Sequence, residues 1–153
     1  MKKPARVFPA PGDLAVLVER PGGLPRGLAI AQGQLRLDEQ RAPALAMIGG
    51  LIETLGDLAA RQPAPAHLPE MRRTCDRVIA LAALYGLDAL AEAGRMLCDL
   101  LLALEARQTV HGEAIAVHVR ALRLLGGDAS DASQVLDELG RVQSHLREGG
   151  APQ

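Results

Sequence analysis

The chain has almost no aromatic side chains: its 153 residues include no Trp, one Tyr and one Phe. Strands favour aromatic and β-branched residues, whereas Leu, Ala, Ile, Val and Met fill the spaces between packed helices well. Any core must therefore be built from aliphatic residues, and the length suffices for a modest one in a single domain. The composition predicts an all-α protein.

The chain also lacks an excess of charge of either sign, because 17 Lys and Arg residues are balanced by 18 Asp and Glu residues. Nucleic acids and anionic membranes are bound through concentrated positive charge, so neither is an expected partner. The apolar run Leu14–Val18 near the N-terminus is too short for a signal peptide or a membrane span. We therefore expect a cytoplasmic protein.

Signatures of metal sites and of catalysis are missing as well. The two cysteines, Cys75 and Cys98, lie in apolar helical runs without a Cys-x-x-Cys or Cys/His cluster, which indicates reduced core thiols. The carboxylates show no paired arrangement of the kind that acid–base catalysis uses, and the Gly-rich segments lack a phosphate-binding context. We expect no catalytic residue, no metal and no cofactor, and hence a protein that is not an enzyme.

Proline and glycine divide the chain into segments. Residues 1–23 are rich in both and are predicted to be irregular, with a short extended piece at Leu14–Val18 as an option. Apolar periodicity predicts six helices, over residues 25–40, 43–59, 69–85, 88–107, 112–125 and 131–147, and Gly86 is expected to cap the third. The inward stripes expected on the second, fourth, fifth and sixth helices are Leu45, Ile48, Ile52, Leu55 and Ala59; Leu90, Leu97, Leu101 and Leu104; Ile115, Val119, Leu122 and Leu125; and Val135, Leu139, Val142 and Leu146. The sequence leaves open whether Pro43 breaks the chain between the first two helices or only kinks it.

The connections after the third and fourth helices are short, and short connections force antiparallel neighbours. This predicts an up-and-down antiparallel four-helix bundle made of the second to fifth helices. The first and last helices would then pack outside the bundle or form a dimer contact. The domain organisation expected is an irregular segment at 1–23, a helical bundle at 24–126, and a C-terminal linker, helix and tail at 127–153.

The stretch Cys75–Gly86, "CDRVIALAALYG", carries few polar side chains after Arg77. At 100° per residue, one side of this helix forms a core stripe. The stripe consists of Met71, Cys75, Val78, Ala82 and Tyr85. The outer side begins with charge and becomes small and flat. It consists of Arg73, Asp76, Ala80 and Ala83, with Arg72 and Ile79 on one flank and Arg77 and Leu84 on the other. Either the terminal helices cover this face, or it is a docking surface for another protein.

The segment Asp76–Gly86 resembles the pattern H-x-[LIV]-K-G-x-[SA]-x-x-[LIFY]-G of histidine phosphotransfer domains, which are helical bundles with a surface histidine. Val78, Ala82, Tyr85 and Gly86 match this pattern, and Ala80 replaces its small glycine. Ala91–Glu105, Ala114–Leu125 and the segment from Pro21 are also similar to alphaproteobacterial proteins of this type, some of them labelled as chemotaxis proteins. The resemblance covers residues 21–125. It implies a bacterial two-component signalling protein that binds a response-regulator receiver or a histidine-kinase domain.

Two positions depart from the pattern, because Asp76 replaces the phospho-accepting histidine and Ile79 replaces the lysine. Phosphotransfer needs an exposed imidazole, and an acyl phosphate on Asp76 would need Mg²⁺ held by further acidic groups. We therefore expect Asp76 to remain unphosphorylated, either as a fixed charge at a docking surface or simply as a solvated helix residue. The partner-binding residues expected are Arg72, Arg73, Asp76, Ile79, Ala80 and Ala83.

Four histidines remain as alternatives to Asp76. His67 is expected in a solvated linker, His111 before the fifth helix, and His145 near the C-terminus. His118 lies on or beside the inward stripe of the fifth helix, where a hydrogen-bonded histidine at the edge of the bundle is expected and a displaced phospho-acceptor is the alternative. Three hypotheses result: a non-catalytic adaptor, a structural module that homodimerises through Ala80 and Ala83, and an active phosphotransfer protein that uses another residue.

Overall fold

The computed structural model describes residues 24–61, 63–127 and 131–148, and every regular element in these ranges is a helix. The chain is therefore all-α, as predicted. It divides into two compact units, Met1–Glu39 and Gln40–Gln153. The irregular segment expected at residues 1–23, with its Leu14–Val18 option, lies outside the described residues.

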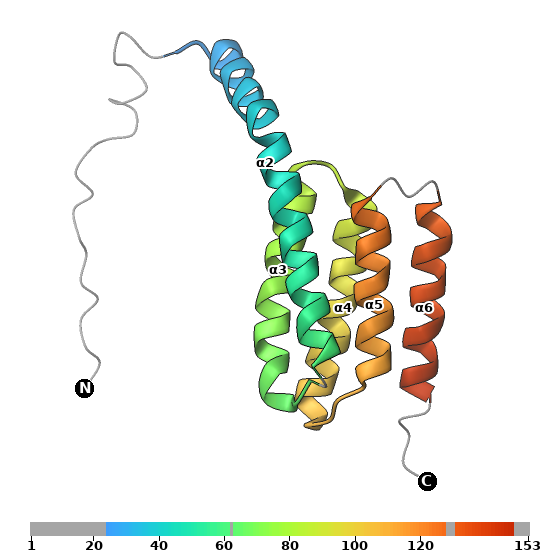
Figure 1. Ribbon diagram of the computed structural model, residues 1–153. Helices are drawn as coiled ribbons and strands as arrows, with labels where there is room; N and C mark the ends of the chain where they lie inside the picture. Colours follow the sequence, from blue (N-terminus) through green and yellow to red (C-terminus); the bar gives the residue numbers. More distant parts are fainter. Residues whose placement is uncertain (1–23, 62, 128–130, 149–153) are drawn as a thin grey trace, which may run out of the picture. The chain divides into compact units, whose positions relative to one another are not determined.

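Helix α2 spans Arg26–Ala60 and contains Pro43 in its interior (Figure 1). The two helices expected on either side of Pro43 are thus a single helix of 35 residues. A proline inside a helix removes one backbone hydrogen bond, here the one that would reach the carbonyl of Glu39. The helix continues because Ala44, Ile48 and Leu55 bury the turns that follow.

Helix α3 (Leu68–Leu84) follows a short 3₁₀ turn, Pro65–His67, and leads through a tight turn into α4 (Asp88–Arg107). Gly86 adopts a left-handed φ of 71°, which a glycine permits without steric cost. The amide of Leu87 donates to the carbonyl of Ala82 at 2.8 Å and closes the end of α3. The predicted cap at Gly86 is confirmed, and this turn makes α3 and α4 antiparallel neighbours (Figure 1).

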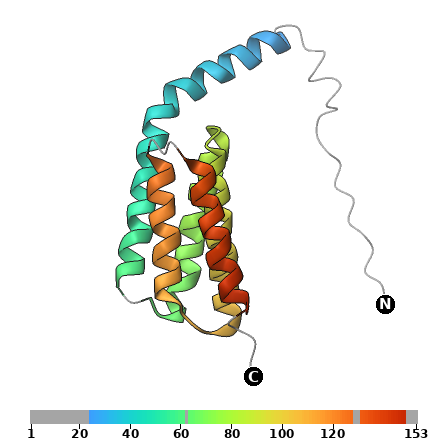
Figure 2. The ribbon, with the colours of Figure 1, turned by 90° about the vertical axis from the view of Figure 1, so that its right-hand side faces the viewer.

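Helix α5 (Gly112–Gly126) packs against α4, and the core lies between α3, α4, α5 and the second half of α2 (Figure 2). The predicted inward stripes of α4 and α5 are buried: Leu90, Leu97, Leu101, Leu104, Ile115, Val119, Leu122 and Leu125. Of the core stripe expected on α3, only Tyr85 is not fully buried. Leu45 was expected in the stripe of α2 but is 40% exposed, because the helix turns Ala44 inward instead.

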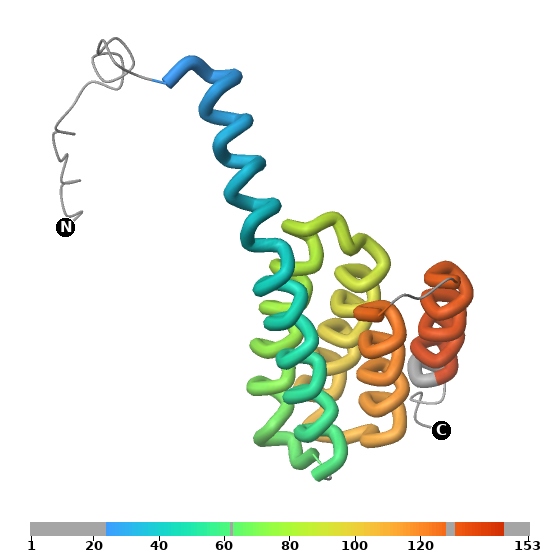
Figure 3. The backbone as a smooth tube through the Cα atoms, turned by 45° about the horizontal axis from the view of Figure 1, so that its top comes forward, coloured from blue at the N-terminus to red at the C-terminus, as the bar shows by residue number. Residues whose placement is uncertain are grey.

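Helix α6 (Ala132–Glu148) packs on α4 and α5, as Figure 3 shows for the red segment beside the orange one. Leu139 is 2% exposed, and the side-chain amide of Gln143 donates to the carbonyl of Met96 at 2.7 Å. The side chain of Leu146, also expected on the buried stripe, lies outside the described residues. Helix α6 thus occupies the outside of the bundle without covering the outer face of α3, where Ala80 and Ala83 are exposed.

Candidate functional site

The outer face of α3 is the surface that sequence reasoning selected, and the structure exposes most of it. Arg73, Asp76, Ala80 and Ala83 are exposed, whereas Arg72 and Ile79 are half-buried. Ala80 and Ala83, one turn apart, thus present only methyl groups at the centre of this face. A surface of this kind permits the close approach of another backbone.

Ile79 differs from the expectation because it belongs to the packing between α3 and α4. A Cβ atom added to Gly94 of α4 would lie 2.7 Å from Cγ1 of Ile79, so the missing side chain of Gly94 makes room for the isoleucine. Position 79, where the phosphotransfer pattern has lysine, is therefore filled by an apolar side chain that holds two helices together. Ile79 borders the candidate docking surface rather than forming its centre.

Asp76 is exposed but has partners on both helices. Its Oδ1 accepts from the Sγ of Cys98 at 3.5 Å, and its Oδ2 lies 4.0 Å from Nη1 of Arg72. Arg72 in turn donates from Nε to Oε1 of Glu105 at 3.3 Å. Asp76 thus belongs to a row of charged side chains that connects α3 to α4, and it also contacts the buried thiol of Cys98.

Cys98 and Glu105 of α4 are the residues of this surface that sequence reasoning missed. A usable signal was present, because a tight turn fixes the register of an antiparallel helix pair. Residues 76 and 98 are equally distant from residue 87 in that turn, which predicts that they face each other. The contact of Ile79 with Gly94 follows nearly the same symmetry.

The two cysteines are free and buried, as expected of core thiols. The thiol of Cys75 donates to the carbonyl of Gly94 at 3.2 Å. The neighbouring Cys98, together with burial and the charge of Asp76, raises the pKa of the Cys75 thiol strongly. This thiol therefore stays protonated, which makes it a poor nucleophile.

His118, the alternative phospho-acceptor, is completely buried. Its Nδ1–H donates to the carbonyl of Ala114 at 2.8 Å, and its Nε2 has no partner among the described residues. Burial lowers the pKa of His118, and the bond to Ala114 offsets part of this effect. An imidazole in this position cannot meet a phosphoryl donor. The histidine expected at the edge of the bundle lies in the core instead, and only one of its ring nitrogens is hydrogen-bonded among the described residues.

The other three histidines are exposed. His67 accepts the amide of Ala64 at its Nδ1 at 3.2 Å and so belongs to the 3₁₀ turn. His111 occupies the N-cap position of α5 without a side-chain hydrogen bond, and His145 lies on α6. None of the three lies on α3, where the candidate surface is.

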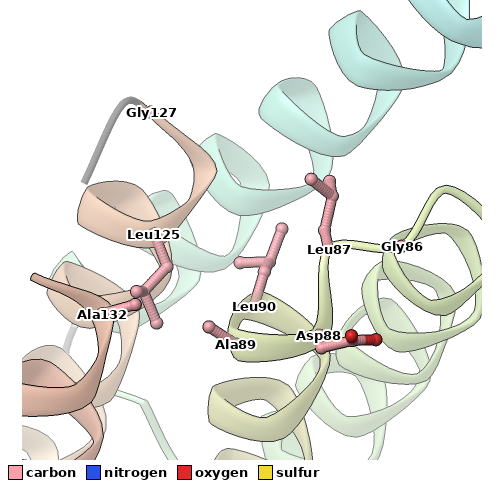
Figure 4. A pocket seen from close by; sticks show the side chains of 8 residues that line it. All are labelled: Gly86, Leu87, Asp88, Ala89, Leu90, Leu125, Gly127 and Ala132. Carbon is pink, nitrogen blue, oxygen red and sulfur yellow. The ribbon is translucent and has the colours of Figure 1, made fainter. Parts of the chain in front are cut away.

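A shallow pocket of about 310 Å³ lies at one end of the helices, between the α3–α4 turn and the facing ends of α5 and α6 (Figure 4). The side chains of Leu87, Leu90 and Leu125 line it. Its one carboxylate, that of Asp88, points away from the leucines in Figure 4. The pocket therefore lacks the convergent polar groups that fix a small ligand.

Within residues 24–61, 63–127 and 131–148, no group of three or more His, Cys, Asp or Glu side chains comes together to hold a metal ion. Helix α2 is long and apolar enough to cross a membrane by length and composition. This is weak evidence for a span, because the core helices of soluble proteins pass the same test.

Comparison with protein-family models, with curated proteins and with solved structures gives no match to this chain.

Proposed function

We propose that the chain is a non-catalytic adaptor of the histidine-phosphotransfer type, which binds a receiver or histidine-kinase domain of a bacterial two-component or chemotaxis system through the outer face of α3. It would modulate phosphoryl flow in the cytoplasm without carrying the phosphoryl group. The proposal has three supports: the arrangement of the helices, the surface of α3, and the chemistry of position 76.

The first support is the way in which helices surround the core. The second half of α2 and helices α3, α4 and α5 all contribute buried residues to one cluster. Short turns connect α3 to α4 and α4 to α5, which is typical of an up-and-down four-helix bundle. We propose that these helices form a bundle of the phosphotransfer type, with α6 as an addition on its outside.

The observation that carries the proposal is the surface of α3 at Ala80 and Ala83. Both alanines are exposed, Leu84 beside them is 56% exposed, and charged residues occupy the preceding turns. A small, flat and partly apolar centre next to charged side chains is typical of a protein-binding surface, because the centre desolvates easily and the charges set orientation.

The residue at position 76 supports the proposal that this chain does not carry the phosphoryl group itself. Its carboxylate cannot act as the imidazole of a phosphotransfer site, and its near neighbours Arg72 and Cys98 are not the acidic groups that would hold Mg²⁺. Asp76 would instead contribute a fixed negative charge at the edge of the interface. That charge is smaller than the charge of a phosphorylated group.

The test is binding of purified receiver and kinase domains from the same organism, measured by calorimetry. Ala80→Arg places a long cation in the flat centre and should raise the Kd at least about tenfold, which corresponds to 1.4 kcal/mol. Ala106→Arg is the matched control, because Ala106 is an exposed alanine on α4 outside this face and should leave the Kd unchanged. Asp76→Asn should also change the Kd.

The adaptor proposal fails if no receiver or kinase domain binds, or if neither Ala80→Arg nor Asp76→Asn changes the Kd. A dimer in solution that Ala80→Arg converts to a monomer would favour the homodimeric structural module instead. Radioactive label that moves from a phosphorylated receiver to this chain in the presence of Mg²⁺ would favour the active phosphotransfer protein.

A further inference from the structure

The first half of α2 is exposed almost throughout. From Arg26 to Pro43 every residue is exposed apart from the half-buried Leu37. The exposed fractions of three large apolar side chains are 48% for Leu28, 61% for Ile30 and 62% for Leu35. Leu28 and Leu35 lie two turns apart on the same side of the helix, and a contiguous exposed apolar patch marks an interaction surface.

This stretch is also a weak helix by its own composition. Gly27 and Gly33 lie inside it, and each glycine costs a helix roughly 1 kcal/mol relative to alanine. In proteins most of the stability of a helix comes from tertiary packing rather than from propensity, and the exposed residues of this stretch have little such packing. A partner that covers its apolar side chains would supply the missing stability.

The spacing of the exposed residues indicates the kind of partner. Leu28, Ala31, Leu35 and Asp38 follow one another at intervals of three, four and three residues, the spacing of the contact positions in a coiled coil. All four are exposed, and at 100° per residue they share one side of the helix. A seam of this kind fits the side of another helix.

We propose that the partner is a second copy of this chain, which pairs its α2 with the first copy in antiparallel orientation along the seam Leu28–Ala31–Leu35. Under a two-fold axis, Leu35 of each copy lies opposite the small Ala31 of the other, and Asp38 of each copy lies at the end of the seam, opposite Leu28. Large side chains against small ones permit close packing of two helices.

Asp38 sets the orientation. A parallel pair would bring the two Asp38 carboxylates face to face in the seam, where like charges repel. The antiparallel pair separates them by about ten residues of helix, roughly 15 Å at 1.5 Å per residue. Each Asp38 also accepts a hydrogen bond from the side-chain amide of Gln34 in its own helix at 3.2 Å, which satisfies one of its oxygens.

A membrane surface is the other occupant that the apolar side chains of α2 suggest, and the seam argues against it. Helices that lie on membranes combine a wide apolar face with Lys and Arg along its borders. Here an acidic residue, Asp38, lies within the seam, and Glu39 follows it. The interaction with a second copy is independent of the adaptor proposal, because it uses α2 and leaves the outer face of α3 unassigned.

The test is the mass of the full chain in solution, measured by sedimentation over a wide range of concentration. The mass should rise with concentration from the 16.1 kDa of the monomer towards twice that value. The double variant Leu28→Glu/Leu35→Glu should raise the dimer dissociation constant at least about tenfold. The matched control Leu102→Glu/Leu124→Glu changes two leucines of similar exposure on α4 and α5 and should leave it unchanged.

The inference is overturned if the chain stays monomeric at every concentration or if both double variants dissociate the dimer equally. Variants with one added, exposed cysteine test the orientation, because the native Cys75 and Cys98 are buried. A mixture of Ala31→Cys and Leu35→Cys chains should cross-link across the two-fold axis far more than either variant alone, whereas preferential cross-linking within each variant would refute the antiparallel pairing. Binding of monomers to anionic phosphatidylserine vesicles, abolished by Leu28→Glu/Leu35→Glu, would replace the second copy with a membrane.

Discussion

Single side chains decide what chemistry this surface can perform. Asp76 has two weak contacts, with the Sγ of Cys98 at 3.5 Å and with Nη1 of Arg72 at 4.0 Å, and more than half of its side chain is exposed. Such contacts favour one position of the carboxylate, and a side chain already held in its bound position loses less entropy when a partner binds. This favours a role in orienting a partner over a role in transferring a group.

The buried imidazole of His118 makes stability depend on pH. Burial lowers the pKa of His118 in the folded state, so below about pH 6.5 the unfolded chain binds a proton that the folded chain refuses. The free energy of unfolding should therefore be at its full value above this pH and fall as the pH drops through it. The fall stops once the pH lies below the pKa of the folded state.

Urea unfolding at pH 8 and at pH 5.5 measures this effect. The variant His118→Leu keeps an apolar side chain in the core and removes the titrating group, so its stability should change less between the two pH values than that of the unaltered chain. The exposed His67, His111 and His145 remain in both proteins and cancel in the comparison. Equal pH dependence in the two chains would refute the assignment.

At the scale of helices, the contact between α3 and α4 depends on a residue without a side chain. Gly94 lies against Ile79 and Cys75, so Gly94→Ala forces the close pair apart. Overpacking of this kind costs typically 1–3 kcal/mol, which exceeds the gain in helix propensity. We predict that Gly94→Ala lowers the free energy of unfolding by about 1–2 kcal/mol in urea denaturation.

Two variants make this prediction specific. A Cβ atom at Gly49, an exposed glycine within α2, would meet nothing within 4 Å, so Gly49→Ala should stabilise the chain by about 0.5–1 kcal/mol. Combining Gly94→Ala with Ile79→Ala should restore part of the lost stability, since the smaller side chain vacates the space. If the two substitutions are simply additive, the steric explanation is wrong.

The positions of the helices could be predicted because Pro and Gly punctuate this sequence and because the apolar periodicity of α4 and α5 is regular. Two features of the fold could not be predicted from the sequence. The buried turns after Pro43 outweigh its missing hydrogen bond, and that depends on packing with other helices. The choice of Ala44 over Leu45 as a core residue is a small rotation of α2 that periodicity does not resolve.

The candidate site could also be predicted only in part. The spacing of 100° per residue correctly predicted that four residues of α3 are exposed, since their exposure follows from the periodicity of the helix alone. These residues are Arg73, Asp76, Ala80 and Ala83. It could not show that Ile79 fills the space over Gly94, because that contact depends on how closely two helices approach. Whether a partner binds this surface stays a prediction, because it concerns a second molecule.

At the scale of the whole molecule, the division into two units predicts unequal protection of the backbone. Amides that follow Ala44 in α2 belong to turns with buried side chains, whereas those before Glu39 lie in exposed turns. Local opening is easiest where few apolar contacts resist it. Amides of residues 30–39 should therefore exchange with deuterium faster than those of residues 48–56 in dilute protein, as measured by mass spectrometry.

Pairing of two copies through α2 would slow exchange in residues 30–39 as concentration rises, with little change in residues 48–56. Uniform protection along α2 in a dilute monomer would contradict the division into units. The variant Leu28→Glu/Leu35→Glu serves as the control, because its exchange should be independent of concentration.

The missing hydrogen bond at Pro43 has a consequence for the way in which this helix comes undone. A helix unravels from its free end inward, one bond at a time, until it reaches turns held by tertiary contacts. In α2 one backbone hydrogen bond, the one to the carbonyl of Glu39, is already missing at Pro43, just before the first buried residue, Ala44. Unfolding of the helix that starts at Arg26 should therefore stop before Ala44. Force, binding or cleavage at the first half of α2 then leaves the packing of the core unchanged.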